Sequence, residues 1–97
     1  MKKQITEFPE YFVDDDGKVY KGDEEQQHVY DKLTGHVFVL IDTWLIKTHI
    51  PIYKLVAKYH LENTNNYESI LFKDSVFNNV SSKNLEFVPD DYESSDK

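Results

Sequence analysis

One amphipathic helix constrains this sequence more than any other feature. The stretch 50–61 carries Pro51 at its start, which suits the first turn of a helix because the N–H that proline lacks would have no partner there. Four apolar side chains follow the i, i+3, i+4, i+7 spacing of one helix face: Ile52, Leu55, Val56 and Tyr59. A helix cannot bury such a face alone, so neighbouring strands must supply a sheet. The pattern predicts an α+β fold with one main helix over residues 51–61.

The strands expected around this helix are short. Residues 11–13 and 18–20 are β-type runs that flank Asp14, Asp15, Asp16 and Gly17, and Asp-Gly between such runs is typical of a hairpin turn. The acidic triplet is also similar to a calcium loop, with oxygens at spaced positions before a glycine. Phe12 would occupy the first of those positions and no helix flanks the loop, so we favour the plain turn over a cation site.

A second group of strands is expected next to the helix. Residues 37–41 are continuously apolar and predict a central strand, Asp42 and Thr43 predict a turn, and residues 44–50 predict a strand that runs into the helix. Alternation places Trp44, Ile46 and Ile50 on one side of that strand. The sequence predicts a single domain over residues 1–97, a small antiparallel sheet, and flexible tails at 1–8 and 90–97. The expected core comprises Phe12, Val19, Val37, Val39, Trp44, Ile46, Leu55, Val56, Tyr59, Leu71, Leu85 and Phe87.

Composition limits the classes of function. The formal net charge is -7 and all 11 basic residues are lysines. Arginine is the preferred partner of phosphates and guanine edges. An acidic chain without arginine is therefore a poor candidate for tight DNA binding unless its lysines cluster. The absence of cysteine excludes disulfides and thiolate metal sites. No apolar run is long enough to cross a membrane or act as a secretory signal, so we expect a cytoplasmic protein without membrane contact.

Three phrases in this order resemble one nuclease family. Residues 11–20 (YFVDDDGKVY) resemble the "Y-x-V-S-x-x-G-x-V" opening of the small module that precedes phage HNH endonuclease domains. Residues 52–57 (IYKLVA) resemble that module's "V-H-R-L-V-A" helix, and residues 84–88 (NLEFV) resemble the "N-L-E-W-V" that closes the HNH ββα-metal region. The resemblance covers residues 11–89 and implies a phage HNH homing-endonuclease-like protein with a degenerate ββα-metal-like C-terminal part.

The sequence departs from the family pattern at the positions of the catalytic residues. In such nucleases a central "N-H-I-D-G" carries the histidine that acts as general base toward a metal-held water. Counting back from residues 84–87, Phe72 stands where that histidine belongs and Leu71 replaces its asparagine neighbour. Asp74, Asn78 and Asn79 remain as weak candidate ligands, and one carboxylate with two amides makes a poor transition-metal site. The resemblance thus implies a nuclease scaffold without its catalytic residues, and we expect no enzymatic activity and no cofactor.

A protein-binding module is the first functional hypothesis. The negative charge, the missing histidine and the abundance of tyrosine favour a dead scaffold that grips a host protein in an infected bacterial cytoplasm. Its acidic clusters could imitate DNA phosphates and so inhibit a host protein that handles nucleic acid. The candidate binding residues are Asp14, Asp15, Asp16, Asp23, Glu24, Glu25, Asp90, Asp91 and Glu93.

Two alternatives remain from the sequence. The first is a residual DNA-binding domain of a homing-endonuclease-like protein, which ranks below protein binding because of the charge. Its candidate contacts are Lys47, Lys54, Lys58, Lys73 and Lys83. The second is a metal-dependent nuclease that uses unfamiliar ligands.

Overall fold

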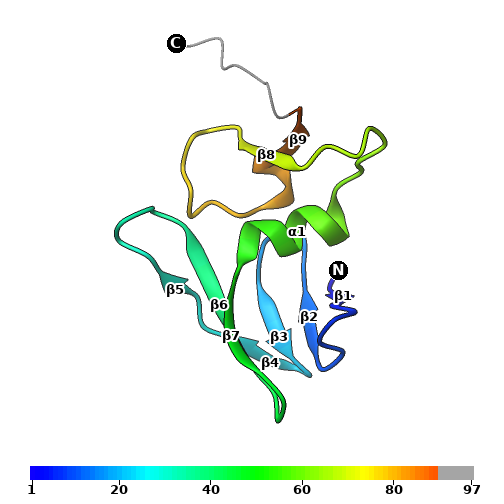
Figure 1. The fold of residues 1–97 in the computed structure, drawn as a ribbon, viewed down its shortest axis with the longest axis vertical. Helices are drawn as coiled ribbons and strands as arrows, with labels where there is room; N and C mark the ends of the chain where they lie inside the picture. The colour runs from blue at the N-terminus through cyan, green and yellow to red at the C-terminus, as the bar shows by residue number, and fades with distance from the viewer. Residues whose placement is uncertain (90–97) are drawn as a thin grey trace.

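The chain folds into small antiparallel sheets with one α-helix, which confirms the predicted α+β class (Figure 1). The computed structural model describes residues 1–89. Its elements are β1 (Lys3–Gln4), β2 (Tyr11–Val13), β3 (Val19–Lys21), β4 (Glu24–Gln26), β5 (Val29–Tyr30), β6 (Val37–Asp42), β7 (Lys47–Pro51), α1 (Ile52–His60), β8 (Ser69–Phe72), the 3-10 helix η1 (Ser82–Asn84) and β9 (Leu85–Val88).

Three sheets surround α1. The first has the order β1-β2-β3-β4, the second β5-β6-β7 and the third β8-β9, and every pair of neighbours is antiparallel and consecutive in the chain. Figure 1 shows α1 across the middle of the molecule, with the two larger sheets on one side and β8–β9 on the other. Within residues 1–89 no helix is long and apolar enough to cross a membrane.

The core lies where α1 meets these sheets. The helix buries Ile52, Leu55, Val56 and Ala57, so the 3.6-residue pattern identified its inner face correctly. Pro51 is the N-cap residue and Leu61 the C-cap, within one residue of the predicted bounds. Strand β6 is the central strand of its sheet, as predicted, and turns Val37, Val39 and Ile41 inward.

The prediction of a strand beginning at Trp44 was wrong. Asp42 ends β6, so the turn predicted at Asp42 and Thr43 is instead a four-residue turn over residues 43–46. The Thr43 N–H donates to the Ile46 carbonyl at 2.8 Å, and Thr43 Oγ1 accepts from the N–H groups of Leu45 and Ile46. β7 therefore begins at Lys47. Trp44 and Ile46, expected in the core, are 90% and 44% exposed. Phe12, Tyr59, Leu71 and Phe87 are only partly buried, while the other expected core members are buried.

The prediction of a flexible tail at residues 1–8 was also wrong. β1 pairs with β2 in the register Lys3↔Val13, and Ile5 is 1% exposed within the core. Phe8 packs against the same core, and backbone pairing with β2 holds the segment in place. The other predicted tail, 90–97, lies outside the described residues.

The Asp14–Gly17 segment is a hairpin turn between β2 and β3, as favoured. Asp14 Oδ1 accepts from the N–H groups of Asp16 (3.0 Å) and Lys18 (2.8 Å), so this carboxylate braces its own turn. Gly17 has φ +89°, and a Cβ there would lie 2.4 Å from Val80 Cγ2. Only glycine fits, and the close approach docks this turn against Val80 and the start of η1, where the Ser82 N–H donates to the Asp15 carbonyl at 2.7 Å.

Candidate nucleic-acid interface around the β8–β9 hairpin

Phe72, the residue in the place of the expected catalytic histidine, ends β8 inside an aromatic cluster. Its ring centroid lies 5.2 Å from those of Tyr53 and Phe77 and 5.5 Å from that of His36. His36 stacks on Phe77 at 4.8 Å with 9° between the planes. Phe72 is 6% exposed, so a side chain at this position packs against α1 and β6 neighbours rather than facing solvent. We call His36, Tyr53, Phe72 and Phe77 the aromatic cluster.

No sequence motif places His36 in this cluster. Its Nδ1 is buried without a hydrogen-bond partner in the described part of the chain. The four members of the cluster come from four separate segments, so no local spacing could have shown them together. Only the fold brings a histidine ring beside the Phe72 position.

The loop that follows, residues 73–84, is held by a polar network. Asn84 is 7% exposed; its Oδ1 accepts from Asp74 N–H at 3.0 Å and its Nδ2 donates to the Asn79 carbonyl at 2.9 Å. Asp74 Oδ2 accepts from Asn79 Nδ2 at 2.8 Å, and Oδ1 from Val76 N–H at 2.9 Å. The hydrogen bond from the Asn79 amide, and to a smaller extent the one from the Val76 N–H, holds the pKa of the Asp74 carboxyl below its usual value.

These residues do not fit the metal that the HNH resemblance implies. Both carboxylate oxygens of Asp74 accept hydrogen bonds from their own loop, and the Asn79 amide is directed at Asp74. Among residues 1–89 no three histidine or carboxylate side chains gather closely enough to hold a metal ion. Asp74 and Asn79 therefore form a loop brace in this arrangement, Asn78 is exposed beside them, and no chemical step is derived through a metal here.

The five candidate DNA-binding lysines fall into separate places. Lys73 and Lys83 lie at the base of the β8–β9 loop, where Lys73 N–H donates to the Asn84 carbonyl at 2.7 Å. Lys54 lies beside β8: it lines a depression of about 600 Å³ with Tyr53, Glu68, Ser69 and Ile70. All three lysines are exposed, and within residues 1–89 no ion pair engages them. We call Lys54, Lys73 and Lys83 the hairpin lysines.

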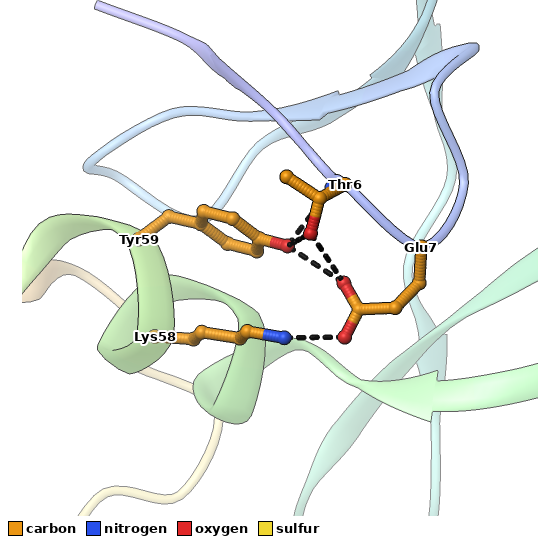
Figure 2. Close-up of polar contacts among 4 residues, drawn as sticks. All are labelled: Thr6, Glu7, Lys58 and Tyr59. Carbon is orange, nitrogen blue, oxygen red and sulfur yellow. Dashed lines mark hydrogen bonds and ion pairs between the residues drawn. The ribbon is translucent and has the colours of Figure 1, made fainter.

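Lys47 lies elsewhere, at the start of β7 opposite Asp42. Lys58 is engaged by Glu7 (Figure 2). Its Nζ donates to Glu7 Oε2, while Glu7 Oε1 accepts from the Tyr59 hydroxyl at 2.8 Å and from Thr6 Oγ1 at 3.1 Å. The hydrogen bond from Lys58, and to a smaller extent the one from Tyr59, lowers the pKa of Glu7 to about 2. This network fastens the β1–β2 connection to α1, which is a structural task for Lys58.

The acidic residues proposed for protein binding come from two segments of the first sheet. Asp14, Asp15 and Asp16 lie in the turn between β2 and β3, whereas Asp23 precedes β4 and Glu24 and Glu25 lie in it. Glu24 and Glu25 pair with Lys21 and Tyr20 of β3. Asp15 and Asp23 also have cationic neighbours, the N-terminal ammonium at 3.5 Å and Lys2 at 3.3 Å. The third cluster, Asp90, Asp91 and Glu93, lies outside the described residues.

The arrangement of these elements is that of an HNH homing endonuclease scaffold. A solved structure described as "DNA binding and cleavage by the HNH homing endonuclease I-HmuI" matches with a TM-score of 0.81 and 23% sequence identity. The match covers 92% of this chain and 52% of that one, so the chain spans about half the length of that endonuclease. No family model and no curated protein matches the sequence. At this identity the similarity establishes the fold.

This finding overturns the expectation that the protein is not an enzyme. That expectation rested on Phe72 and Leu71 in place of two family residues, whereas the matching fold belongs to a nuclease. The fold also supports the DNA-binding alternative better than the first hypothesis of a protein-binding inhibitor. Host-protein binding, inhibition, DNA mimicry and a location in the cytoplasm of an infected host stay predictions.

Proposed function

We propose that this protein binds DNA through its HNH-type scaffold, as the DNA-binding part of a homing-endonuclease-like protein. The observation that carries this function is the structural similarity over 92% of the chain to an endonuclease described as binding and cleaving DNA. Asp15 and Asp23, two of the acidic candidates for a DNA-mimicking surface, have the N-terminal ammonium and Lys2 as neighbours, which weighs against that surface.

The hairpin lysines are the residues of this chain that offer phosphates a local cationic surface. They surround one hairpin and are exposed, whereas Lys58 is neutralised by Glu7 and Lys47 faces Asp42. With a net charge of -7, the rest of the chain repels a polyanion. Binding is therefore weak, sensitive to salt, and dependent on these few lysines.

Fluorescence anisotropy with a labelled DNA duplex tests this function. Three phosphate contacts predict that the logarithm of the affinity falls with the logarithm of the salt concentration with a slope of about -3. Absence of binding in dilute salt would contradict the proposed function. A slope near zero would contradict the phosphate contacts, because bound counterions must then stay on the DNA.

A pair of double variants locates the contacts. Lys73→Gln with Lys83→Gln should weaken binding at low salt by at least about tenfold and reduce the slope by about 2. Lys3→Gln with Lys47→Gln removes the same charge from β1 and β7 and should leave the slope unchanged. Equal losses from the two pairs would show that total charge, and not this hairpin, governs binding.

Cleavage is measured on the same preparation with supercoiled plasmid and Mg²⁺. Nicking that disappears with Asp74→Ala would place the reaction at the β8–β9 loop. Nicking that survives Asp74→Ala would place the ligands elsewhere. Binding without nicking would leave the DNA-binding role standing by itself.

A further inference from the structure

The turn between β6 and β7 presents large apolar side chains to solvent. Trp44 is 90% exposed and Leu45 74%, and Ile46 beside them is 44% exposed. Tight turns normally carry glycine, asparagine, aspartate or serine at such positions. The turn is nevertheless firmly built, because Thr43 satisfies both Leu45 and Ile46 amides. We call residues 43–46 the hairpin tip; a rigid tip with exposed aromatic and aliphatic groups is typical of a contact surface.

A groove runs along the hairpin tip. It measures about 500 Å³, and the opposite wall is the β1–β2 turn, with Phe8 and Pro9 contributing apolar surface. That wall is fixed in place, since Phe8 N–H donates to the Ile5 carbonyl and Tyr11 N–H to the Phe8 carbonyl at 3.0 and 2.8 Å. The groove is thus a preformed apolar slot between two rigid turns, large enough for one or two side chains. We call it the tip groove.

The charges that border the tip groove select its occupant. Its described lining includes two carboxylates, Glu7 and Glu10, and no lysine. Glu7 stays ionised down to strongly acidic pH, because Lys58 and Tyr59 lower its pKa to about 2. DNA phosphates would meet these carboxylates, and a second copy of the chain, at -7, would bring the same charge. Glu7 is already paired with Lys58, so Glu10 on the β1–β2 wall is the carboxylate that a basic residue beside an inserted apolar side chain would meet.

We propose that the tip groove binds a partner polypeptide that inserts an apolar side chain flanked by lysine or arginine. The apolar anchor packs between Trp44, Leu45 and Phe8, and a flanking cation lies near Glu10. The hairpin tip and β8–β9 lie at opposite ends of the molecule (Figure 1). This surface therefore leaves the hairpin lysines open, and it stands whether or not they bind DNA.

Trp44 is itself the probe for the first test, because it is the only tryptophan in the sequence. The titrant is a synthetic peptide with a Leu-Phe pair between lysines, and the signal is Trp44 emission. A saturable blue shift is expected as water leaves the indole. Two matched peptides control for each requirement: one with serines replacing the Leu-Phe pair, and one with glutamates replacing the lysines. Neither should give the shift.

Charge variants of the protein test the border of the groove. Glu10→Lys should weaken binding of the basic peptide by about fivefold to tenfold. Asp16→Lys makes the same change of charge in the β2–β3 turn and should alter the affinity less than about twofold. Leu45→Ser should weaken binding by at least about fivefold while keeping the Trp44 probe.

Three outcomes would overturn this assignment. The first is no emission change with the lysine-flanked peptide at any attainable concentration. The second is self-association through the tip, seen as a concentration-dependent mass in sedimentation that Trp44→Ser abolishes. The third is a shift in Trp44 emission with duplex DNA that exceeds the shift with the basic peptide, which would make the tip a DNA contact.

Discussion

Two hairpins of this protein, β6–β7 and β8–β9, join antiparallel strands in opposite ways. β6–β7 closes through four residues, 43–46, in which one backbone bond and the Thr43 hydroxyl satisfy the amides of Thr43, Leu45 and Ile46. β8–β9 is joined by residues 73–84, which require the buried Asn84, the Asp74 brace and the packing of Val80 against Gly17. One connection is held by its own backbone and the other by tertiary contacts.

The difference decides where each hairpin keeps its apolar side chains. The short turn needs none of its side chains beyond Thr43, so Trp44 and Leu45 can point into solvent without loss of order. The long connection must bury polar and apolar groups to become ordered at all, because each fixed residue loses conformational entropy. Exposed apolar surface at β6–β7 is therefore spare for a partner, while the β8–β9 hairpin buries Phe72 and Val80 and leaves Val76 and Phe77 only about half exposed.

Truncation of Phe72 is the strongest test of this comparison. Phe72→Ala should lower the free energy of unfolding by about 3 to 4 kcal/mol, because it opens a cavity among Tyr53, His36 and Phe77. Urea unfolding followed by circular dichroism measures the change. Phe77→Ala is the matched control: Phe77 is 43% exposed, so about 1 kcal/mol is expected. Equal losses would mean that the cluster does not tie β8 to the core.

Removal of the buried amide should have the next largest effect. Asn84→Ala leaves Asp74 N–H and the Asn79 carbonyl without their partners and should destabilise the protein by about 2 kcal/mol. Hydrogen exchange of the loop amides should rise in parallel, since the loop loses its central brace. Asn78→Ala, at an exposed position in the same loop, should stay within about 0.5 kcal/mol of the parent. If the two variants behave alike, the polar network does not hold the long connection.

The sequence predicted what depends on local pattern. The 3.6-residue period located α1, the apolar run located β6, and Asp14 with Gly17 marked a turn through their own chemistry. It failed at Trp44, because strict alternation fits an exposed tip as well as a strand, and only the Thr43 hydroxyl decides between them.

The candidate site was less accessible from sequence than the fold. The position of Phe72 could be counted from the resemblance, but its ring partners come from residues 36, 53 and 77, which no spacing rule connects. The five candidate lysines likewise share a residue type and not a surface. Whether a lysine is available depends on a distant carboxylate such as Glu7, which lies 51 residues from Lys58.

Glu7, on the wall opposite the hairpin tip, should make a smaller, pH-dependent contribution to the free energy of unfolding. Because the folded pKa of Glu7 is lowered, its contribution is present above the unfolded value near 4.5 and is lost as pH falls toward 2. Glu7→Gln should therefore reduce the free energy of unfolding at pH 7 by about 0.5 to 1 kcal/mol, the range of an exposed ion pair.

The measurement is the difference in free energy of unfolding between the parent and Glu7→Gln, followed from pH 7 to pH 2. The difference should shrink steadily as pH falls from 4.5 toward 2, since the Glu7 carboxyl, with a folded pKa of about 2, becomes protonated over this range. Glu10→Gln, on the same turn, serves as the control and should show no such trend. If the difference in free energy of unfolding between the parent and Glu7→Gln grew as pH fell, the Glu7 network would not be its cause.

The smallest effect is expected at the hairpin tip itself. Trp44→Ser removes the largest side chain of the β6–β7 turn, yet at 90% exposure it should change the free energy of unfolding by less than about 0.5 kcal/mol. Val39→Ala, fully buried in the same hairpin, should cost about 2 kcal/mol and shows that the assay detects damage to β6. Circular dichroism is the readout, because the variant has no tryptophan. A loss above about 1 kcal/mol for Trp44→Ser would mean that the tip packs onto its own fold. The two hairpins would then differ in length alone, and the tip groove would be a part of the core rather than a surface for a partner.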